Sequence, residues 1–140
     1  MNRRVGVLLL AMLLGLATSA RAVTMHYHLE IKNETNITQR IAFEHMQCMH
    51  IVSHSGGYEI AAHQVWNGTM ITTIVGYNFQ GIPCISHEVA SAFWLVVDHG
   101  LGGALKAEKR TLRPWELVKR RGGRYHIDAQ PGLWLHVVIH

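Results

Sequence analysis

The sequence predicts an all-β domain, a small β-sandwich or barrel of about seven to nine strands with one disulfide, after a cleaved signal peptide. Three observations predict this class. Apolar and polar side chains alternate with a period of two along much of the chain, Gly, Asn and Pro separate the alternating runs, and two cysteines are present. Short strands at close spacing are typical of sandwiches and barrels. Residues 23–140 are long enough for one such domain.

The amino terminus has the order of features that a translocase recognises. Arg3 and Arg4 supply positive charge, an apolar run over residues 5–16 follows, and a small-x-small pattern lies at residues 20–22. Residues 1–22 are therefore predicted to be a signal peptide, and the mature domain to be periplasmic or secreted. A retained anchor is the alternative, but a membrane-spanning helix needs about 20 apolar residues, so we expect no membrane span after cleavage.

The two cysteines, Cys48 and Cys84, both lie in the mature part. Two cysteines in an oxidising compartment most simply pair, and this pair would close a loop of about 36 residues, which stabilises the fold by about 3–4 kcal/mol. A thiol metal ligand or a catalytic nucleophile is the alternative, and it requires a cysteine that stays reduced outside the cell. We predict the disulfide.

Residues 26–32 form the first predicted strand, because apolar side chains at every second position fall on one face and polar ones on the other. A turn cluster follows at residues 33–36, and residues 37–51 offer one or two further strands. Residues 58–65 and 70–79 have the same alternation and are predicted strands as well.

An Asn67-Gly68 pair separates the last two of these runs, and Asn-Gly is a strong hairpin signal, so we expect a turn there. Residues 89–97 are a continuous apolar run, which is typical of a strand buried on both faces. A flexible connection at residues 100–103 follows.

Residues 115–119 and 124–128 flank an Arg-Arg-Gly-Gly sequence and predict another hairpin. A short helix that begins at Pro114 and ends at Gly122 is the alternative. Residues 133–139 are the last predicted strand.

Histidine is unusually frequent, with 11 in the chain, all of them in the mature part. His26 and His28 lie one residue apart on a predicted strand, so both rings project from one face, and such a pair can chelate zinc or copper. His136 and His140 share a face of the last strand. If the first and last strands are neighbours, these four imidazoles could converge on a zinc or copper ion. Otherwise we expect no cofactor.

No catalytic residues are predicted. The sequence contains neither the Gly-x-Ser-x-Gly pattern of a nucleophilic serine nor a glycine-rich phosphate loop. We therefore expect a protein that is not an enzyme.

Basic residues are concentrated in residues 106–124. Three of the 13 Lys and Arg leave with the leader, so ten basic residues face nine acidic ones in the mature chain, whose net charge is near +1. A basic segment can meet an anionic envelope component or an acidic protein, although a solvated loop and hairpin is the plainer interpretation. Nucleic acid is not an expected partner outside the cytoplasm. The candidate interaction residues are Arg113, Lys119, Arg120, Arg121 and Arg124.

One short pattern resembles a known family. It consists of Ser55-Gly56-Gly57-Tyr58, Trp66-Asn67-Gly68 and Cys84. Over about 30 residues it is similar to the Ser-Gly, Tyr and Trp-Gly pattern of periplasmic C-type lysozyme inhibitors, which are small disulfide-bonded β-barrels. The chain departs from that pattern by lacking a residue between Gly and Tyr and a lysine near Trp-Gly, and by its long extension after the second cysteine. The resemblance implies inhibition of a cell-wall hydrolase.

The expected function is thus that of an exported β-sandwich that binds another macromolecule, either a protein or an anionic component of a bacterial envelope. A histidine-based zinc or copper protein is the first alternative, and a lysozyme-inhibitor-like protein is the second.

Overall fold

The computed structural model describes residues 25–73, 75–85, 90–110 and 113–140, so the predicted signal peptide, residues 1–22, lies outside the described residues. Within these ranges the chain forms ten strands and one short 3₁₀ helix. The strands are β1 (His26–Asn33), β2 (Gln39–Gln47), β3 (Met49–His54), β4 (Glu59–Ile60), β5 (Val65–Thr72), β6 (Ser91–Val97), β7 (Gly103–Lys109), β8 (Glu116–Arg121), β9 (Ile127–Gln130) and β10 (Leu135–Ile139). The 3₁₀ helix, η1, is Asp98–Gly100.

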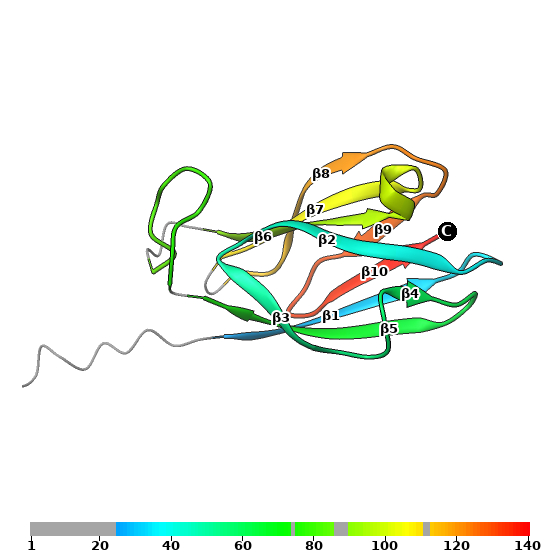
Figure 1. Ribbon diagram of the computed structural model, residues 1–140, viewed down its shortest axis with the longest axis horizontal. Helices are drawn as coiled ribbons and strands as arrows, with labels where there is room; N and C mark the ends of the chain where they lie inside the picture. Colours follow the sequence, from blue (N-terminus) through cyan, green and yellow to red (C-terminus); the bar gives the residue numbers. More distant parts are fainter. Residues whose placement is uncertain (1–24, 74, 86–89, 111–112) are drawn as a thin grey trace, which may run out of the picture.

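Two five-stranded sheets make up the fold (Figure 1). The first, here named the β1 sheet, has the order β3-β5-β1-β10-β9, and the second, the β6 sheet, has the order β4-β2-β6-β7-β8. Strands β1 and β10 pair in parallel, and the other neighbours are antiparallel. The predicted all-β class is confirmed, and the arrangement is a sandwich.

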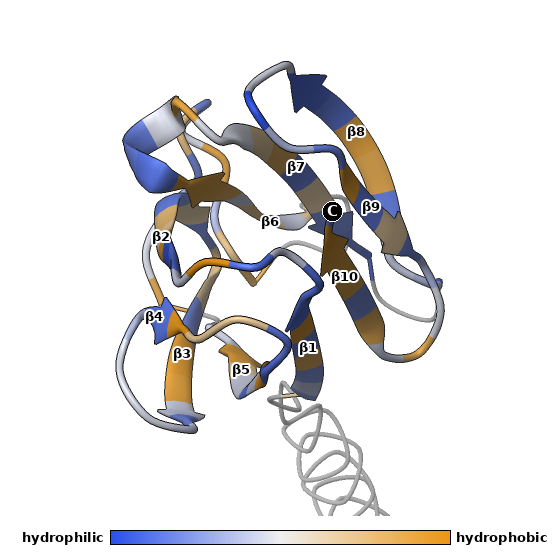
Figure 2. Ribbon diagram, turned by 90° about the vertical axis from the view of Figure 1, so that its right-hand side faces the viewer, coloured by the Kyte–Doolittle hydropathy of each residue, from blue (hydrophilic) through white to orange (hydrophobic). Residues whose placement is uncertain are grey.

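The core lies between the two sheets and follows the period-two pattern of the sequence. Tyr27, Leu29 and Ile31 of β1 are buried, while the residues between them face outward, and the colours of Figure 2 alternate along β1 and β10 accordingly. Strand β6 is buried on both faces over nearly its whole length, as its continuous apolar run predicts. Residues from both sheets join one apolar cluster.

The chain passes from the β6 sheet to the β1 sheet between β2 and β3, and Cys48 occupies that corner. Cys48 is bonded to Cys84, with their Cα atoms 5.3 Å apart, so the predicted disulfide is confirmed. The bond ties the long connection between β5 and β6 to the corner of the sandwich.

The hairpin predicted at Asn67-Gly68 is wrong. Strand β5 runs straight through both residues, and the alternation places Trp66 and Gly68 on its buried side. A Cβ at Gly68 would lie 2.4 Å from the Trp66 ring, so the glycine is required for close approach of an aromatic side chain and not for a turn. The strand predicted over residues 58–65 shrinks to the two residues of β4.

The hairpin predicted around residues 115–128 is also wrong, and so is its helical alternative. Residues of β8 are extended and pair with β7, whereas β9 pairs with β10 in the other sheet. The connection between β8 and β9 therefore crosses the sandwich. Strand β7 was not anticipated by the sequence, because its lysines and glutamate suggest a solvated segment, yet it pairs with β6 along its full length.

Candidate functional site

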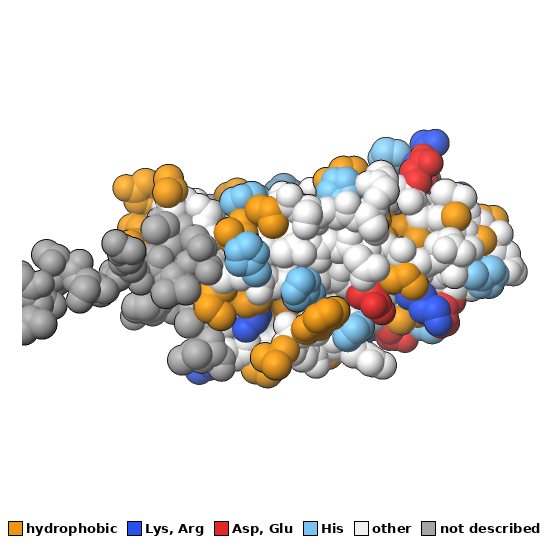
Figure 3. Space-filling view, turned by 90° about the horizontal axis from the view of Figure 1, so that it is seen from below, with side chains coloured by type: hydrophobic (Ala, Val, Ile, Leu, Met, Phe, Trp, Pro, Cys, Tyr) orange, Lys and Arg blue, Asp and Glu red, His pale blue; other side chains and the backbone are white. Residues whose placement is uncertain are grey.

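Strands β1 and β10 lie side by side, as the metal hypothesis requires, and their outward side chains share one face, here named the histidine face. The ring of His28 lies against Trp134 with centroids 4.6 Å apart, and Nδ1 of His136 lies 3.3 Å from Oε1 of Glu30. Trp134 and Glu30 thus lie between the imidazoles of His28 and His136. Figure 3 shows histidines (pale blue) at several separate positions on this side of the molecule.

His140 is held by carboxylates at the far end of β10. Its Nδ1 lies 3.1 Å from Oε2 of Glu34, and its Nε2 lies 3.4 Å from Oδ2 of Asp128. The second oxygen of Asp128 is 3.0 Å from Nε2 of His126. A hydrogen bond from Lys32, followed by the charges of Lys32 and His140, lowers the pKa of Glu34.

The four predicted ligands therefore do not converge. His26 and His28 lie near the start of β1, while His136 and His140 lie beside Glu30 and Glu34 further along the sheet. Among the described residues, no three or more His, Cys, Asp or Glu side chains are grouped so as to hold a metal ion. The zinc or copper site remains a prediction from the sequence.

The five predicted interaction residues are distributed over different parts of the molecule. Arg121 lies over the Trp94 ring at 4.4 Å, and Arg120 lies 3.4 Å from Asp128, so both guanidinium groups have partners within the chain. Lys119 and Arg124 are exposed near the end of β8 and in the connection after it. Arg113 lies in the connection between β7 and β8, at the other end of β8.

Lys109 shows that this basic segment also serves the fold. Its side chain is buried at the end of β7, its Nζ donates hydrogen bonds to the backbone carbonyls of Arg110 and Arg113, and it lies 4.9 Å from the centroid of the Tyr27 ring. Burial lowers the pKa of Lys109 because it disfavours the charged form. This lysine organises a loop.

Residues 75–85, here named the tethered loop, protrude beyond the sheets at one end of the sandwich (Figure 1). Large apolar side chains are exposed on it, with Tyr77 exposed to 71% and Phe79 to 67%. The exposed apolar residues of the loop are Val75, Tyr77, Phe79, Ile82 and Ile85. Several large apolar side chains of one short loop are thus open to solvent together, which makes the loop a candidate interaction surface.

The tethered loop is held by its own hydrogen bonds. Oδ1 of Asn78 accepts from the backbone N–H groups of Gln80 and Ile82, each at 2.9 Å, and the N–H of Cys84 donates to the carbonyl of Gly76 at 3.0 Å. Gly76 has a φ of 90°, which suits glycine. With the disulfide at its end, the loop presents its apolar side chains in a set conformation.

The sequence does not predict this loop, because Val75, Tyr77 and Phe79 alternate with polar or small residues and so predict a strand over residues 70–79. The turn residues within and after that run, Gly76 among them, carry the signal that could have found it. A strand of the sheet would also need a buried face, whereas here the apolar side chains face solvent.

No helix in the described ranges is long and apolar enough to span a bilayer. A comparison with protein-family models gives no match to this chain, and a search of curated proteins gives none either.

Proposed function

We propose that the mature domain is an exported binding module that docks on another protein through the tethered loop. The exposure of five large apolar side chains on this loop of eleven residues carries the proposal. Aromatic side chains are enriched at protein interfaces, and Tyr77 and Phe79 stand where a partner could enclose them. A loop already held by a disulfide and hydrogen bonds loses little conformational entropy on binding.

A protein partner is favoured over an anionic envelope component by the composition of the loop. Residues 75–85 contain no Lys, Arg, Asp or Glu, so attraction between opposite charges cannot hold this surface to an anionic polymer. A convex apolar protrusion is complementary to an apolar cleft on a folded protein.

Export is part of the proposal and rests on the leader pattern of residues 1–22. The Cys48–Cys84 disulfide is compatible with an oxidising compartment. Intact-mass analysis of protein recovered from the periplasm or the medium tests it, and the expected mass lacks about 22 residues. A mass that includes the leader would refute export by cleavage.

The docking surface is tested with a Tyr77→Ser/Phe79→Ser variant. Leu101→Ser is the matched control, because Leu101 is exposed to 62% but lies in the turn after β6, away from the tethered loop. A partner isolated by cross-linking in envelope extracts is purified and titrated against each protein by calorimetry. Wild type and the control should bind equally, and the double variant should bind at least about tenfold more weakly.

Equal binding by the double variant would place the interface elsewhere. In a second arm of the experiment, binding to vesicles of neutral and of anionic lipid is measured. If the loop binds vesicles and no protein partner is found, the proposed protein partner is wrong and a lipid surface takes its place. Both variants should unfold within about 0.5 kcal/mol of wild type, because exposed substitutions rarely change stability more.

Inhibition of a cell-wall hydrolase is a second candidate, because a rigid protruding loop is a shape that can fill an active-site cleft. The residues of the lysozyme-inhibitor-like pattern have structural roles in this chain, since Trp66 is buried and its Nε1 donates to the carbonyl of Gly57 at 3.0 Å. Lysis of cell-wall suspensions by C-type lysozyme tests this candidate. Inhibition that is lost in the Tyr77→Ser/Phe79→Ser variant would support it.

A further inference from the structure

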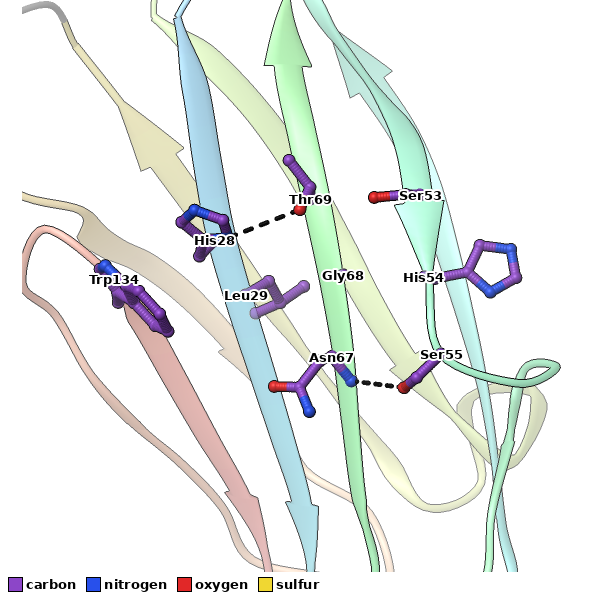
Figure 4. Close-up of a pocket in the computed structure, with 9 residues that line it drawn as sticks. All are labelled: His28, Leu29, Ser53, His54, Ser55, Asn67, Gly68, Thr69 and Trp134. Atoms are coloured by element: carbon purple, nitrogen blue, oxygen red, sulfur yellow. Dashed lines mark hydrogen bonds between the residues drawn. The ribbon is translucent and has the colours of Figure 1, made fainter.

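The outer side of the β1 sheet contains a hollow that neither the tethered loop nor the predicted metal ligands explain (Figure 4). Its volume is about 230 Å³, and it spans β3, β5 and β1 with Trp134 at one side. The lining residues are His28, Leu29, Ser53, His54, Ser55, Asn67, Gly68, Thr69 and Trp134.

An aromatic side chain forms one wall. Trp134 immediately precedes β10, and because Leu135 points into the core, Trp134 points outward and is exposed to 50%. Its ring contacts the His28 ring, with centroids 4.6 Å apart, and lies nearly parallel to the His136 ring at a centroid distance of 6.3 Å. The indole is thereby fixed while about half of its surface stays open to solvent.

Neutral hydrogen-bonding groups form the floor and the opposite wall. Figure 4 shows the Ser53 hydroxyl directed toward β5 and the Asn67 amide directed toward β1, whereas the His54 ring points away. Thr69 Oγ1 lies 3.4 Å from Nδ1 of His28. Within the described part of the chain, the Asn67 amide and the Ser53 hydroxyl have no hydrogen-bond partner, so both are available to a ligand.

The lining contains no Lys, Arg, Asp or Glu. The carboxylate of Glu30, which lies opposite Asn67 in the sheet register, is directed to His136. A charged ligand would enter without a counter-charge, which disfavours phosphate and other ions. The volume is also below the range of about 300–1,000 Å³ that is typical of clefts for drug-sized molecules, so one small ring fits.

We propose that this hollow binds a neutral sugar ring of an oligosaccharide. A pyranose has an apolar C–H face, which matches the exposed face of Trp134, and equatorial hydroxyls, which can exchange hydrogen bonds with Asn67, Ser53 and Thr69. An indole face beside neutral amide and hydroxyl groups, with no formal charge, is complementary to both properties at once. The site is distinct from the tethered loop and goes beyond the protein-docking function proposed above.

The ligand is longer than one sugar, because a second hollow adjoins the first. It has a volume of about 530 Å³ and shares His28 and Trp134 with the smaller one, so both side chains line the two hollows. Its other lining residues are Met25, His26, Tyr27, Lys109, Arg113, Pro114 and Leu133. A chain of linked sugars that stacks on Trp134 can continue from one hollow into the other.

Titration with cellohexaose and with chitohexaose, two neutral β-1,4-linked oligosaccharides with flat ring faces, tests the proposal by NMR and calorimetry. The indole N–H signal of Trp134, assigned from its loss in Trp134→Ala, should shift on addition of at least one of the two, with a dissociation constant of about 1 mM or tighter. The affinity should not change with added salt, since no charge pair is formed.

Trp134→Ala and Asn67→Ala should each weaken binding by about tenfold, which corresponds to the loss of one stacking contact or one good hydrogen bond. Trp94→Ala is the matched control, because Trp94 faces outward on the β6 sheet and should leave sugar binding unchanged. The Tyr77→Ser/Phe79→Ser variant should also bind sugar normally, so failure of the docking surface and failure of the sugar site are separately visible.

Three results would overturn the proposal. They are the absence of any shift with both oligosaccharides at about 10 mM, equal binding by wild type and both hollow variants, and salt-sensitive binding of polygalacturonate in preference to the neutral chains. The last result would assign the surface to an anionic polymer.

Discussion

The two ends of the sandwich are closed by different chemistry. At the end where β1 stops, the side chain of Asn33 is fully buried, and its Nδ2 donates to the carbonyls of Ile37, Ile60 and Ala61 at 2.8, 2.9 and 3.1 Å. Its Oδ1 accepts from the backbone N–H of Thr35 at 3.0 Å. At the other end, the Cys48–Cys84 disulfide holds the tethered loop.

The two ends therefore use their polar groups differently. The Asn33 side chain donates to the carbonyl of Ile37, in the connection after β1, and to that of Ala61, in the connection after β4, so polar groups there are paired within the protein. A disulfide uses only two sulfur atoms. The other side chains of the tethered loop remain able to face solvent. The covalent end can therefore carry exposed apolar side chains without loosening the fold.

The largest effect is expected at the hydrogen-bonded end. Asn33→Ala should lower the free energy of unfolding by about 3–5 kcal/mol, because four hydrogen bonds of a buried side chain are lost, among them the buried one to the carbonyl of Ile60. Urea denaturation measures it. Asn33→Asp keeps the acceptor but not the amide donors and should also be strongly destabilised, and a cost below about 1 kcal/mol for either variant would refute this role.

The next effect is expected at the covalent end. Cys48→Ala/Cys84→Ala should cost about 3–4 kcal/mol, since the bond closes a loop with a sequence separation of 36 residues. It should also speed hydrogen exchange of the Cys84-position amide, which donates to Gly76, while Asn33→Ala should not affect that amide selectively. Unchanged exchange in the tethered loop would show that its own hydrogen bonds suffice.

A smaller effect is expected from Lys109, beside the same end. Lys109→Met should cost about 1–2 kcal/mol, because the backbone carbonyls of Arg110 and Arg113 lose a buried donor while the methylene packing is kept. Lys119→Met is the matched control, since Lys119 is exposed on β8 and should change stability by less than about 0.5 kcal/mol. Equal effects of the two substitutions in thermal denaturation would contradict this assignment.

The smallest effect is a pH dependence at the Asn33 end. The pKa of Glu34 is lowered from its ordinary value of 4.5 in the folded state. As acid is added, the folded state therefore binds fewer protons than the unfolded state. The stability that this group contributes is present above about pH 4.5 and is lost as the pH falls further. The melting temperature of wild type should therefore fall more steeply than that of Glu34→Gln between about pH 5 and pH 3. Lys32→Met should remove most of this difference, because Lys32 is the main cause.

The sequence by itself determined the all-β class, the disulfide and the outward position of His26 and His28. Each depends on local information, because side chains alternate across any strand and two cysteines in an oxidised protein have one partner available. The register of Tyr27, Leu29 and Ile31 followed from alternation alone, and so did the double burial of β6.

Only the tertiary structure decided which strands are neighbours and which apolar residues are exposed. Asn67-Gly68 has the local signal of a turn, yet the Trp66 ring occupies the space over Gly68. The packing of that ring in the core overrides the turn propensity. Lys109 has the sequence signal of a solvated charge, yet two carbonyls surround its ammonium. The tethered loop has the alternation of a strand, yet its apolar side chains Val75, Tyr77 and Phe79 are exposed to solvent. Alternation specifies two faces of a segment, and only packing against a partner specifies which of them is buried.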